Sequence, residues 1–117
     1  MTETHFAVVD RPDESRYVLV DQSSDGREAG EESYVDVDAA GTVERVLFHT
    51  GVDEAYGGQG LASFLVQHVV DDVVARGYAI VPVCPYVAKW LIRHPEYDAH
   101  VVKPTPTHLR AVNARQQ

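Results

Sequence analysis

The segment Gly57-Gly58-Gln59-Gly60-Leu61-Ala62-Ser63 decides the fold, because the hydrophobic pattern changes there from that of strands to that of a helix. Its glycines permit a sharp turn and let a ligand approach the backbone closely. The helix that follows begins with unpaired backbone N–H groups and a partial positive charge, which favour an anion. The turn alone is consistent with a bound phosphorylated cofactor, and equally with a glycine-rich helix start that binds nothing.

The chain before this turn has the pattern of short strands. Four segments are rich in β-forming residues or alternate between apolar and polar positions, namely residues 6–10, 16–20, 33–37 and 42–50. Residues 27–32 have poor strand propensity. Asp25-Gly26 is a strong hairpin signal. Strands joined by such short turns predict an antiparallel meander.

The chain after the turn has the pattern of a helix, a strand and a second helix. Apolar residues recur at helical spacing from Leu61 to Ala75, and Arg76-Gly77 is typical of a helix C-terminus. Residues 78–83 form a short predicted strand, parallel to residues 43–50 because a helix connects the two. A second helix is expected from Pro85 to about Arg93.

The predicted fold is one α/β domain with a mixed sheet. It spans residues 1–104 and has about four antiparallel strands, then a helix, a parallel strand and a second helix. Residues 105–117 look like a polar C-terminal tail, frayed or weakly helical. A chain of 117 residues is long enough for one core but not for two.

Composition limits the classes of function. The net charge of -8, without a basic stripe, argues against binding to nucleic acid or to a membrane surface. No apolar run approaches the length of a membrane span, and the first residues do not resemble a signal peptide. The single cysteine excludes an intrachain disulfide, so we expect a cytoplasmic protein. No histidine joins Cys84 at a metal-ligand spacing, so we predict no metal site.

The glycine turn matches neither of two common phosphate-binding motifs. A P-loop needs a lysine directly after its second glycine, and no lysine lies near Gly60. The dinucleotide fingerprint G-x-G-x-x-G would need a glycine at Ser63 and an acidic residue where Val81-Pro82 stands. The ligand, if there is one, is therefore of another class.

Cys84 is the residue with the clearest chemical potential. It follows a predicted strand and precedes Pro85, which suits the first position of a helix. A helix N-terminus favours an anion and so makes a thiolate more available. The alternative is an unreactive buried thiol, which is how a lone cysteine often behaves.

Three segments together resemble a known family. They are His49-Thr50-Gly51-Val52, Gly58-Gln59-Gly60-Leu61-Ala62-Ser63 and Cys84-Pro85-Tyr86-Val87, and they are similar to the small, single-domain GCN5-related N-acetyltransferase-like (GNAT) proteins. The resemblance covers roughly residues 14–100. The glycine turn resembles the acetyl-CoA pyrophosphate loop, written Q/R-x-x-G-x-G/A, with Gly57 in place of the first residue. Gly51 stands where the small subfamily carries a glutamate.

The resemblance implies both a geometry and an activity. The sheet should splay between the strands at residues 43–50 and 78–83, and the pantetheine arm of acetyl-CoA should lie in that splay. The implied activity is transfer of the acetyl group from acetyl-CoA to a primary amine. The implied cofactor-binding residues are Leu47, Phe48, His49, Gly57, Gly58, Gln59, Gly60, Leu61, Ala62, Ser63, Cys84, Tyr86 and Lys89.

The resemblance also places Cys84 near the acetyl thioester. Cys84 either accepts the acetyl group and passes it to an amine, or only lines the site while the amine attacks acetyl-CoA directly. His49 is either a general base or a structural residue, and we favour the second. The backbone N–H groups of residues 47–49 are candidates for polarising the thioester carbonyl. Tyr86 either protonates the departing CoA thiolate or packs in its helix, and Lys89 either meets a CoA phosphate or is solvated.

The predicted acceptor is a small molecule or a peptide end that carries a primary amine, and the protein is expected to be a monomer or a weak homodimer. A net-acidic chain attracts a cationic acceptor. The cluster Glu28, Glu31 and Glu32 is another attraction for a cation, although we interpret it as a solvated hairpin face. Two alternatives remain: a non-catalytic module that binds or senses acyl-CoA, and a protein-interaction domain whose glycine turn is structural.

Overall fold

The computed structural model describes residues 5–116 and contains one five-stranded sheet in the order β1-β2-β3-β4-β5. The strands are β1 (Phe6–Arg11), β2 (Arg16–Asp21), β3 (Arg27–Ala39), β4 (Thr42–Val52) and β5 (Ala79–Pro82). Neighbours are antiparallel from β1 to β4, whereas β5 runs parallel to β4. The predicted meander followed by a parallel strand is therefore confirmed.

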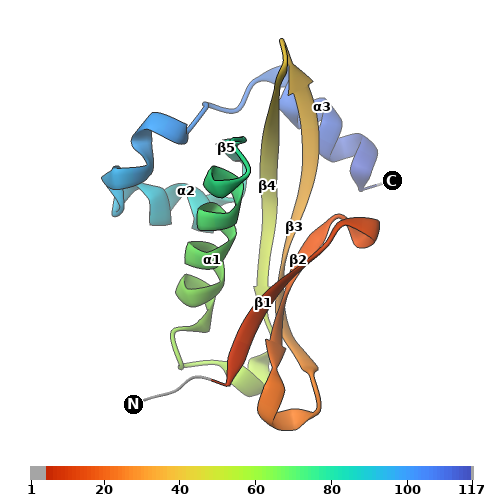
Figure 1. Cartoon of the computed structure of the whole chain (residues 1–117), viewed down its shortest axis with the longest axis vertical. Coiled ribbons are helices and arrows are strands. Elements are labelled where there is room, and N and C mark those ends of the chain that lie inside the picture. Colours follow the sequence, from red (N-terminus) through yellow and green to blue (C-terminus); the bar gives the residue numbers. More distant parts are fainter. Residues whose placement is uncertain (1–4, 117) are drawn as a thin grey trace.

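Helices cover both faces of this sheet (Figure 1). They are α1 (Leu61–Ala75), α2 (Pro85–Ile92) and α3 (Pro106–Arg115), with short 3₁₀ helices at Pro12–Glu14, Gln22–Ser24, Glu54–Tyr56 and Pro95–His100. Helices α1 and α2 lie on one face and α3 lies on the other, so the apolar core has two parts. Within residues 5–116, no helix is both long and apolar enough to cross a membrane.

Helix α1 is held by packing more than by intrinsic propensity. Its valines are stiff at χ1 and weaken an isolated helix. Leu65, Val66, Val69, Val70 and Val73 are nevertheless fully buried against the sheet. Complete burial of each such side chain contributes about 1.5–3 kcal/mol, which outweighs the propensity loss of a few tenths. The helix ends before Gly77, whose φ of +75° is the left-handed conformation expected after a helix C-terminus.

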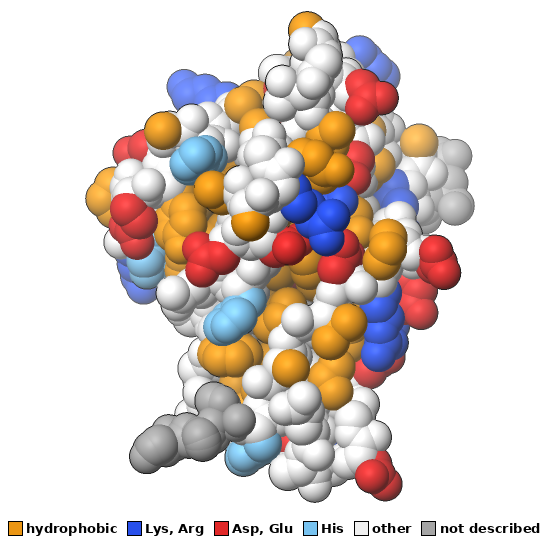
Figure 2. All heavy atoms as spheres, viewed as in Figure 1, with side chains coloured by type: hydrophobic (Ala, Val, Ile, Leu, Met, Phe, Trp, Pro, Cys, Tyr) orange, Lys and Arg blue, Asp and Glu red, His pale blue; other side chains and the backbone are white. Residues whose placement is uncertain are grey.

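Strand β3 is longer than the sequence predicts. It begins at Arg27, whereas the pattern indicated a strand only from Ser33. Cross-strand ion pairs explain the difference, since Arg11 contacts Glu28 at 2.6 Å and Arg16 contacts Glu31 at 3.0 Å. Such pairs offset the poor strand propensity of the acidic residues. Acidic and basic side chains also lie next to one another on the face of the molecule shown in Figure 2.

The C-terminal segment is a docked helix, which differs from the frayed or weakly helical tail that its composition indicated. Thr105 caps α3 in a reciprocal capping box with His108. His108 is buried, and its Nε2 lies 2.7 Å from Glu44 Oε1 on β4. Val112 packs against Val46 and Val81. These contacts come from residues distant in the chain, so a local pattern does not reveal them.

A buried polar network built on Arg45 joins the strands to α1. The Arg45 side chain donates to both oxygens of Asp36 at 2.8 Å and to the Tyr17 hydroxyl at 2.8 Å. The Tyr17 hydroxyl in turn donates to Asp72 of α1 at 2.6 Å. Burial and the Asp72 hydrogen bond raise the pKa of Tyr17, so it remains a neutral donor. The guanidinium also lies 3.8 Å from the centre of the Tyr34 ring.

We expect Arg45→Met to lower the free energy of unfolding by about 3 kcal/mol, because it strips a buried hydrogen-bond network of its cation. The matched control is Arg27→Met, since Arg27 is more than half exposed and lies 3.6 Å from Asp53. Removal of that surface pair should cost less than about 1 kcal/mol. Urea unfolding followed by circular dichroism measures both. Equal losses in the two variants would contradict the role of the Arg45 network.

Candidate active site

The glycine turn leaves the N-terminus of α1 open to a ligand. Gly60 is the N-cap residue, with a φ of +71°, and no side chain among the described residues caps the helix. The first intrahelical bond runs from the Phe64 N–H to the Gly60 carbonyl at 3.2 Å. The N–H groups of Leu61, Ala62 and Ser63 therefore have no intrahelical partner and are available to an anion.

Two adjoining pockets extend from this turn to α2. The first is lined by Val52, Tyr56, Gly57, Gly58, Gly60, Leu61, Ala62, Ser63 and Tyr86. The second is lined by Ser63, Tyr86, Lys89, Trp90, Arg93 and His94. Ser63 and Tyr86 belong to both pockets, so the surface is continuous. Of the loop residues predicted from the sequence, Gln59 lines neither pocket.

The second pocket has a rigid wall and two cations. The Trp90 indole donates to Ser63 Oγ at 2.9 Å and stacks on His94 with ring centres 3.6 Å apart. Lys89 lies on α2, Arg93 is the C-cap residue one helical turn further on, and both line the pocket. The sequence indicated Lys89 but missed Arg93, although the spacing of four residues places both on one face of the helix.

The sheet opens between β4 and β5 beyond Leu47. The last paired residues are Leu47 and Pro82. The Leu47 carbonyl then accepts the N–H groups of Val83 and Cys84, at 3.0 and 2.9 Å. On the other side, β3 pairs Ser33 with His49 and Tyr34 with Leu47, so Phe48 is a bulge that lies outside both registers. The predicted backbone donors at residues 47–49 thus lie where the two strands part.

Cys84 lies at this opening and is the N-cap residue of α2, as predicted. Its side chain is buried, and Sγ lies 3.3 Å from Thr50 Oγ1 on β4. The Thr50 hydroxyl donates a hydrogen bond to Glu32 Oε1 on β3. Contacts between neighbours therefore connect three polar side chains, Glu32 on β3, Thr50 on β4 and Cys84 at the start of α2.

Glu32 is the residue that sequence reasoning missed. Its assignment to a solvated acidic face was wrong, because its relative exposure is 0%. Oε1 accepts from Thr50, whereas Oε2 has no partner among the described residues. Burial raises the pKa of Glu32 well above 4.5, against the opposing effect of the Thr50 hydrogen bond. The sequence could have indicated this burial, because residues two positions apart in a strand lie on the same face and Glu32 lies two positions before Tyr34, which is buried.

The His49 side chain points away from the Thr50–Cys84 contact. His49 alternates with Thr50 along β4 and so faces the opposite side of the sheet. Its side chain is 55% exposed, and Nε2 lies 3.7 Å from Glu31 Oε2. Our preference for a structural His49 over a general base stays a prediction. Within residues 5–116, no group of three or more His, Cys, Asp or Glu residues is arranged to hold a metal ion.

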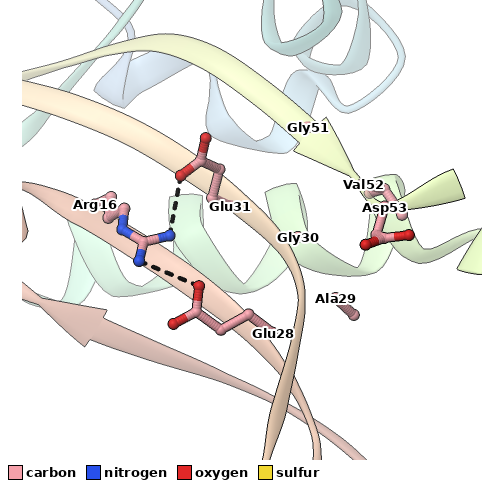
Figure 3. Close-up of a pocket in the computed structure, with 8 residues that line it drawn as sticks. All are labelled: Arg16, Glu28, Ala29, Gly30, Glu31, Gly51, Val52 and Asp53. Atoms are coloured by element: carbon pink, nitrogen blue, oxygen red, sulfur yellow. Dashed lines mark hydrogen bonds and ion pairs between the residues drawn. The ribbon is translucent and has the colours of Figure 1, made fainter. Parts of the chain in front are cut away.

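The remainder of the acidic cluster lines an open pocket on the side of the sheet that His49 faces. Figure 3 shows the Arg16 guanidinium between Glu28 and Glu31, with Gly51 and Asp53 at the other end of the pocket. The distances from Arg16 to Glu28 and Glu31 are 3.2 and 3.0 Å. These two carboxylates are thus partly neutralised, as expected for an ion-paired surface.

The comparisons with known proteins agree with this geometry. The family model described as GCN5-related N-acetyl-transferase matches residues 16–101. A GCN5-like putative N-acetyltransferase from Staphylococcus aureus is 22% identical, with a TM-score of 0.60 over 91% of this chain and 97% of that one. A ribosomal-protein-alanine N-acetyltransferase from Brucella melitensis biovar Abortus 2308 is 20% identical, with a TM-score of 0.50 over 77% of this chain and 65% of that one. A search of the curated proteins finds no match.

These two structures support the mixed, splayed fold, and the family model covers most of the sheet, the glycine turn, α1 and α2. The family uses acetyl-CoA as the acetyl donor, and its members are N-acetyltransferases. The chain belongs to the GCN5-related N-acetyltransferase family.

Proposed function

We propose that the protein transfers the acetyl group of acetyl-CoA to a primary amine, and that Cys84 carries the acetyl group between the two. The observation that supports this most directly is the position of Cys84. It lies where β4 and β5 part, at the N-terminus of α2, with its sulfur in contact with Thr50. A helix N-terminus favours the thiolate, which is the attacking form.

The cofactor would extend from the glycine turn to this cysteine. The CoA diphosphate would accept from the free N–H groups of Leu61, Ala62 and Ser63. Lys89 and Arg93 offer cations to the remaining phosphate. The pantetheine arm would follow the gap between β4 and β5, where the backbone pairing ends at Leu47. This path brings the thioester to Cys84.

The transfer has two balanced steps. In the first, the bond from Cys84 Sγ to the acetyl carbon forms, the thioester bond to CoA breaks, and the CoA thiolate takes up a proton. In the second, the amine nitrogen bonds to the acetyl carbon, the Cys84 sulfur leaves, and one amine proton returns to it. Backbone N–H groups at residues 47–49 would stabilise the oxyanion in both steps. Tyr86 lines the same surface and would donate a hydrogen bond to the leaving CoA thiolate.

The acceptor amine would approach from the side of the sheet that His49 faces. Helices α1 and α2 fill the other side. Gly51 keeps this approach open, since a Cβ at this position would lie 3.2 Å from His49 Nε2. The chain offers little room for a deep acceptor pocket, so we propose a small amine or a peptide end as acceptor, a monomer or weak homodimer as the active form, and the cytoplasm as its compartment.

Incubation with acetyl-CoA should add the mass of one acetyl group to the intact protein, and Cys84→Ala should abolish that addition. Intact-mass spectrometry before and after addition of an amine measures both half-reactions. The single cysteine makes the site unambiguous. Loss of the adduct on addition of amine, with acetylated amine formed, completes the test.

Two other outcomes would favour the alternatives. If CoA raises the melting temperature but no adduct and no acetylated amine form across an amine panel, the protein is an acyl-CoA-binding module. If millimolar CoA gives no thermal shift at all, the glycine turn is structural, and the acetyltransferase proposal is overturned.

Gly57→Arg should tighten CoA binding about fivefold, because it supplies the phosphate contact that the turn lacks. The backbone at Gly57 is extended, with φ −65° and ψ 154°, so it tolerates a side chain. The matched control is Gly57→Ala, which adds the same Cβ, 3.3 Å from the Glu54 carbonyl oxygen, without a cation. Titration calorimetry with CoA compares the two. Equal affinities would show that the phosphates do not lie beside residue 57.

A further inference from the structure

We propose that Glu32 and Thr50 form a proton relay that activates Cys84, so that Glu32 is a positioning residue for the acetyl transfer. The inference rests on the proposed function and adds to it the group that removes the thiol proton. Its basis is the pair of contacts that connects Cys84 at the start of α2 to Thr50 on β4, and Thr50 to the buried carboxylate of Glu32 on β3.

The hydrogen bonds have a definite direction. A threonine hydroxyl has one proton, and the Thr50 hydroxyl donates it to Glu32 Oε1. The Thr50 oxygen then presents a lone pair to Cys84, whose Sγ lies 3.3 Å away. The thiol S–H is therefore the donor to Thr50. If the proton instead lies on Glu32, the same heavy atoms give the reverse direction and a thiolate at Cys84.

A purely structural role does not account for Glu32. Burial of a carboxylate costs several kcal/mol unless its oxygens are hydrogen-bonded. Glu32 is fully buried, yet only one of its oxygens has a partner among the described residues. Arg45, a buried cation on β4, bonds to Asp36 and Tyr17 instead. An incompletely satisfied carboxylate beside the single cysteine is the pattern of a functional group.

Burial also brings the pKa of the Glu32 carboxyl closer to that of a thiol, which favours proton transfer between them. An ordinary glutamate is about four pKa units more acidic than an ordinary thiol, so it is a poor base toward cysteine. Burial raises the pKa of Glu32 and reduces this difference. A base with a pKa near the working pH is largely deprotonated and still binds a proton strongly enough to remove it from the thiol.

The other titratable groups near Glu32 do not compete for this role. Tyr17 is its cross-strand neighbour on β2, and its hydroxyl is held by Asp72 and Arg45. On α1, Asp72 is held by Tyr17 and Arg76, and Asp71 by Tyr97. Glu31 and His49 alternate to the opposite face of the sheet. At the start of α2, the titratable group that affects Glu32 is Cys84 itself.

The relay moves protons without any further reactant. The S–H bond of Cys84 breaks as its proton passes to Thr50 Oγ1, and the Thr50 proton passes to Glu32 Oε1. The sulfur then bonds to the acetyl carbon, and the CoA thiolate leaves. The proton on Glu32 returns through Thr50, so that the CoA thiol forms and Glu32 is a carboxylate again. In the second step one amine proton passes to the Cys84 sulfur as it leaves, so the thiol is restored and Glu32 remains a carboxylate.

The test measures acetylation of Cys84 by p-nitrophenyl acetate and by acetyl-CoA across a range of pH, with the Cys84→Ala rate subtracted. In the wild type the rate should rise as Glu32 ionises and then level off. Glu32→Gln should react about 100-fold more slowly near neutral pH, because a general base typically contributes that much. Its rate should rise in proportion to hydroxide, with no plateau where the wild type has one. A structural role would leave the shape of this profile unchanged.

Thr50 supplies the matched pair of variants. Thr50→Val keeps the shape of the side chain and breaks the relay, so it should match Glu32→Gln, whereas Thr50→Ser keeps the hydroxyl and should retain most of the rate. Asp38→Asn removes an exposed carboxylate at the far end of β3 and should behave as the wild type. If Thr50→Val and Thr50→Ser react equally, the relay is overturned.

Stability gives an independent readout. Since folding raises the pKa of Glu32 above 4.5, the folded state binds this proton more tightly than the unfolded chain. Wild-type stability should therefore decline relative to Glu32→Gln as the pH rises above about 4.5. A constant difference across that range would contradict a buried, titrating Glu32.

The two probes separate this inference from the proposed function. Acetylation by p-nitrophenyl acetate but not by acetyl-CoA overturns the CoA proposal and supports the relay, provided that Glu32→Gln is slow. Acetylation by both, with equal pH profiles in wild type and Glu32→Gln, overturns the relay alone. No acetylation of Cys84 by either probe overturns both, because an activated thiol must react with an activated ester.

Discussion

The parting of β4 and β5 after Leu47 is the constraint on which the rest of the site depends. Pro82 has no N–H to continue the ladder, and the Leu47 carbonyl is already used by Val83 and Cys84. The bulge at Phe48 bends β4 at the same level. As a result, β5 ends at Pro82, Cys84 is the N-cap residue of α2, and the cysteine lies across from Thr50 rather than in a closed sheet. One interruption of backbone pairing thus produces both the opening and the position of Cys84, the nucleophile that we propose.

Two of the buried polar side chains, Arg45 and Glu32, have surroundings of opposite character. Around Arg45, the donors meet carboxylates or a phenol, and the network ties β2, β3 and β4 to α1. Around Glu32, one carboxylate oxygen has no partner within the described residues. A fully hydrogen-bonded network stabilises one packing arrangement. An incompletely hydrogen-bonded carboxylate has a shifted pKa instead, which is typical of functional sites. The Arg45 network stabilises one part of the sheet, whereas the reactivity that we propose lies at Glu32 in another part.

The sequence was sufficient where structure follows from neighbouring residues. The helix at Leu61–Ala75, its glycine start and the N-cap position of Cys84 all follow from local spacing, and the structure has them as predicted. It was insufficient where residues distant in the chain decide. Strand β3 begins early because Arg11 and Arg16 pair with its glutamates, and Glu32 is buried because α1 and α2 cover its face. The bulge at Phe48 depends on the pairing of two whole strands, so no single segment encodes it.

Helix α3 has a consequence for the order in which the chain acquires its structure. Arg115 donates to the backbone carbonyls of Glu14 and Ser15, about one hundred residues earlier, at 3.0 and 3.3 Å. Contacts of such sequence separation form late, because the intervening loop must close first. During synthesis on a ribosome, the glycine turn, Cys84 and Glu32 all emerge before Arg115 does. The part of the molecule that contains the glycine turn and Cys84 can therefore form before α3 covers the apolar strip of Val46 and Val81. Until then, that strip is the surface where a nascent chain is most exposed to wrong partners.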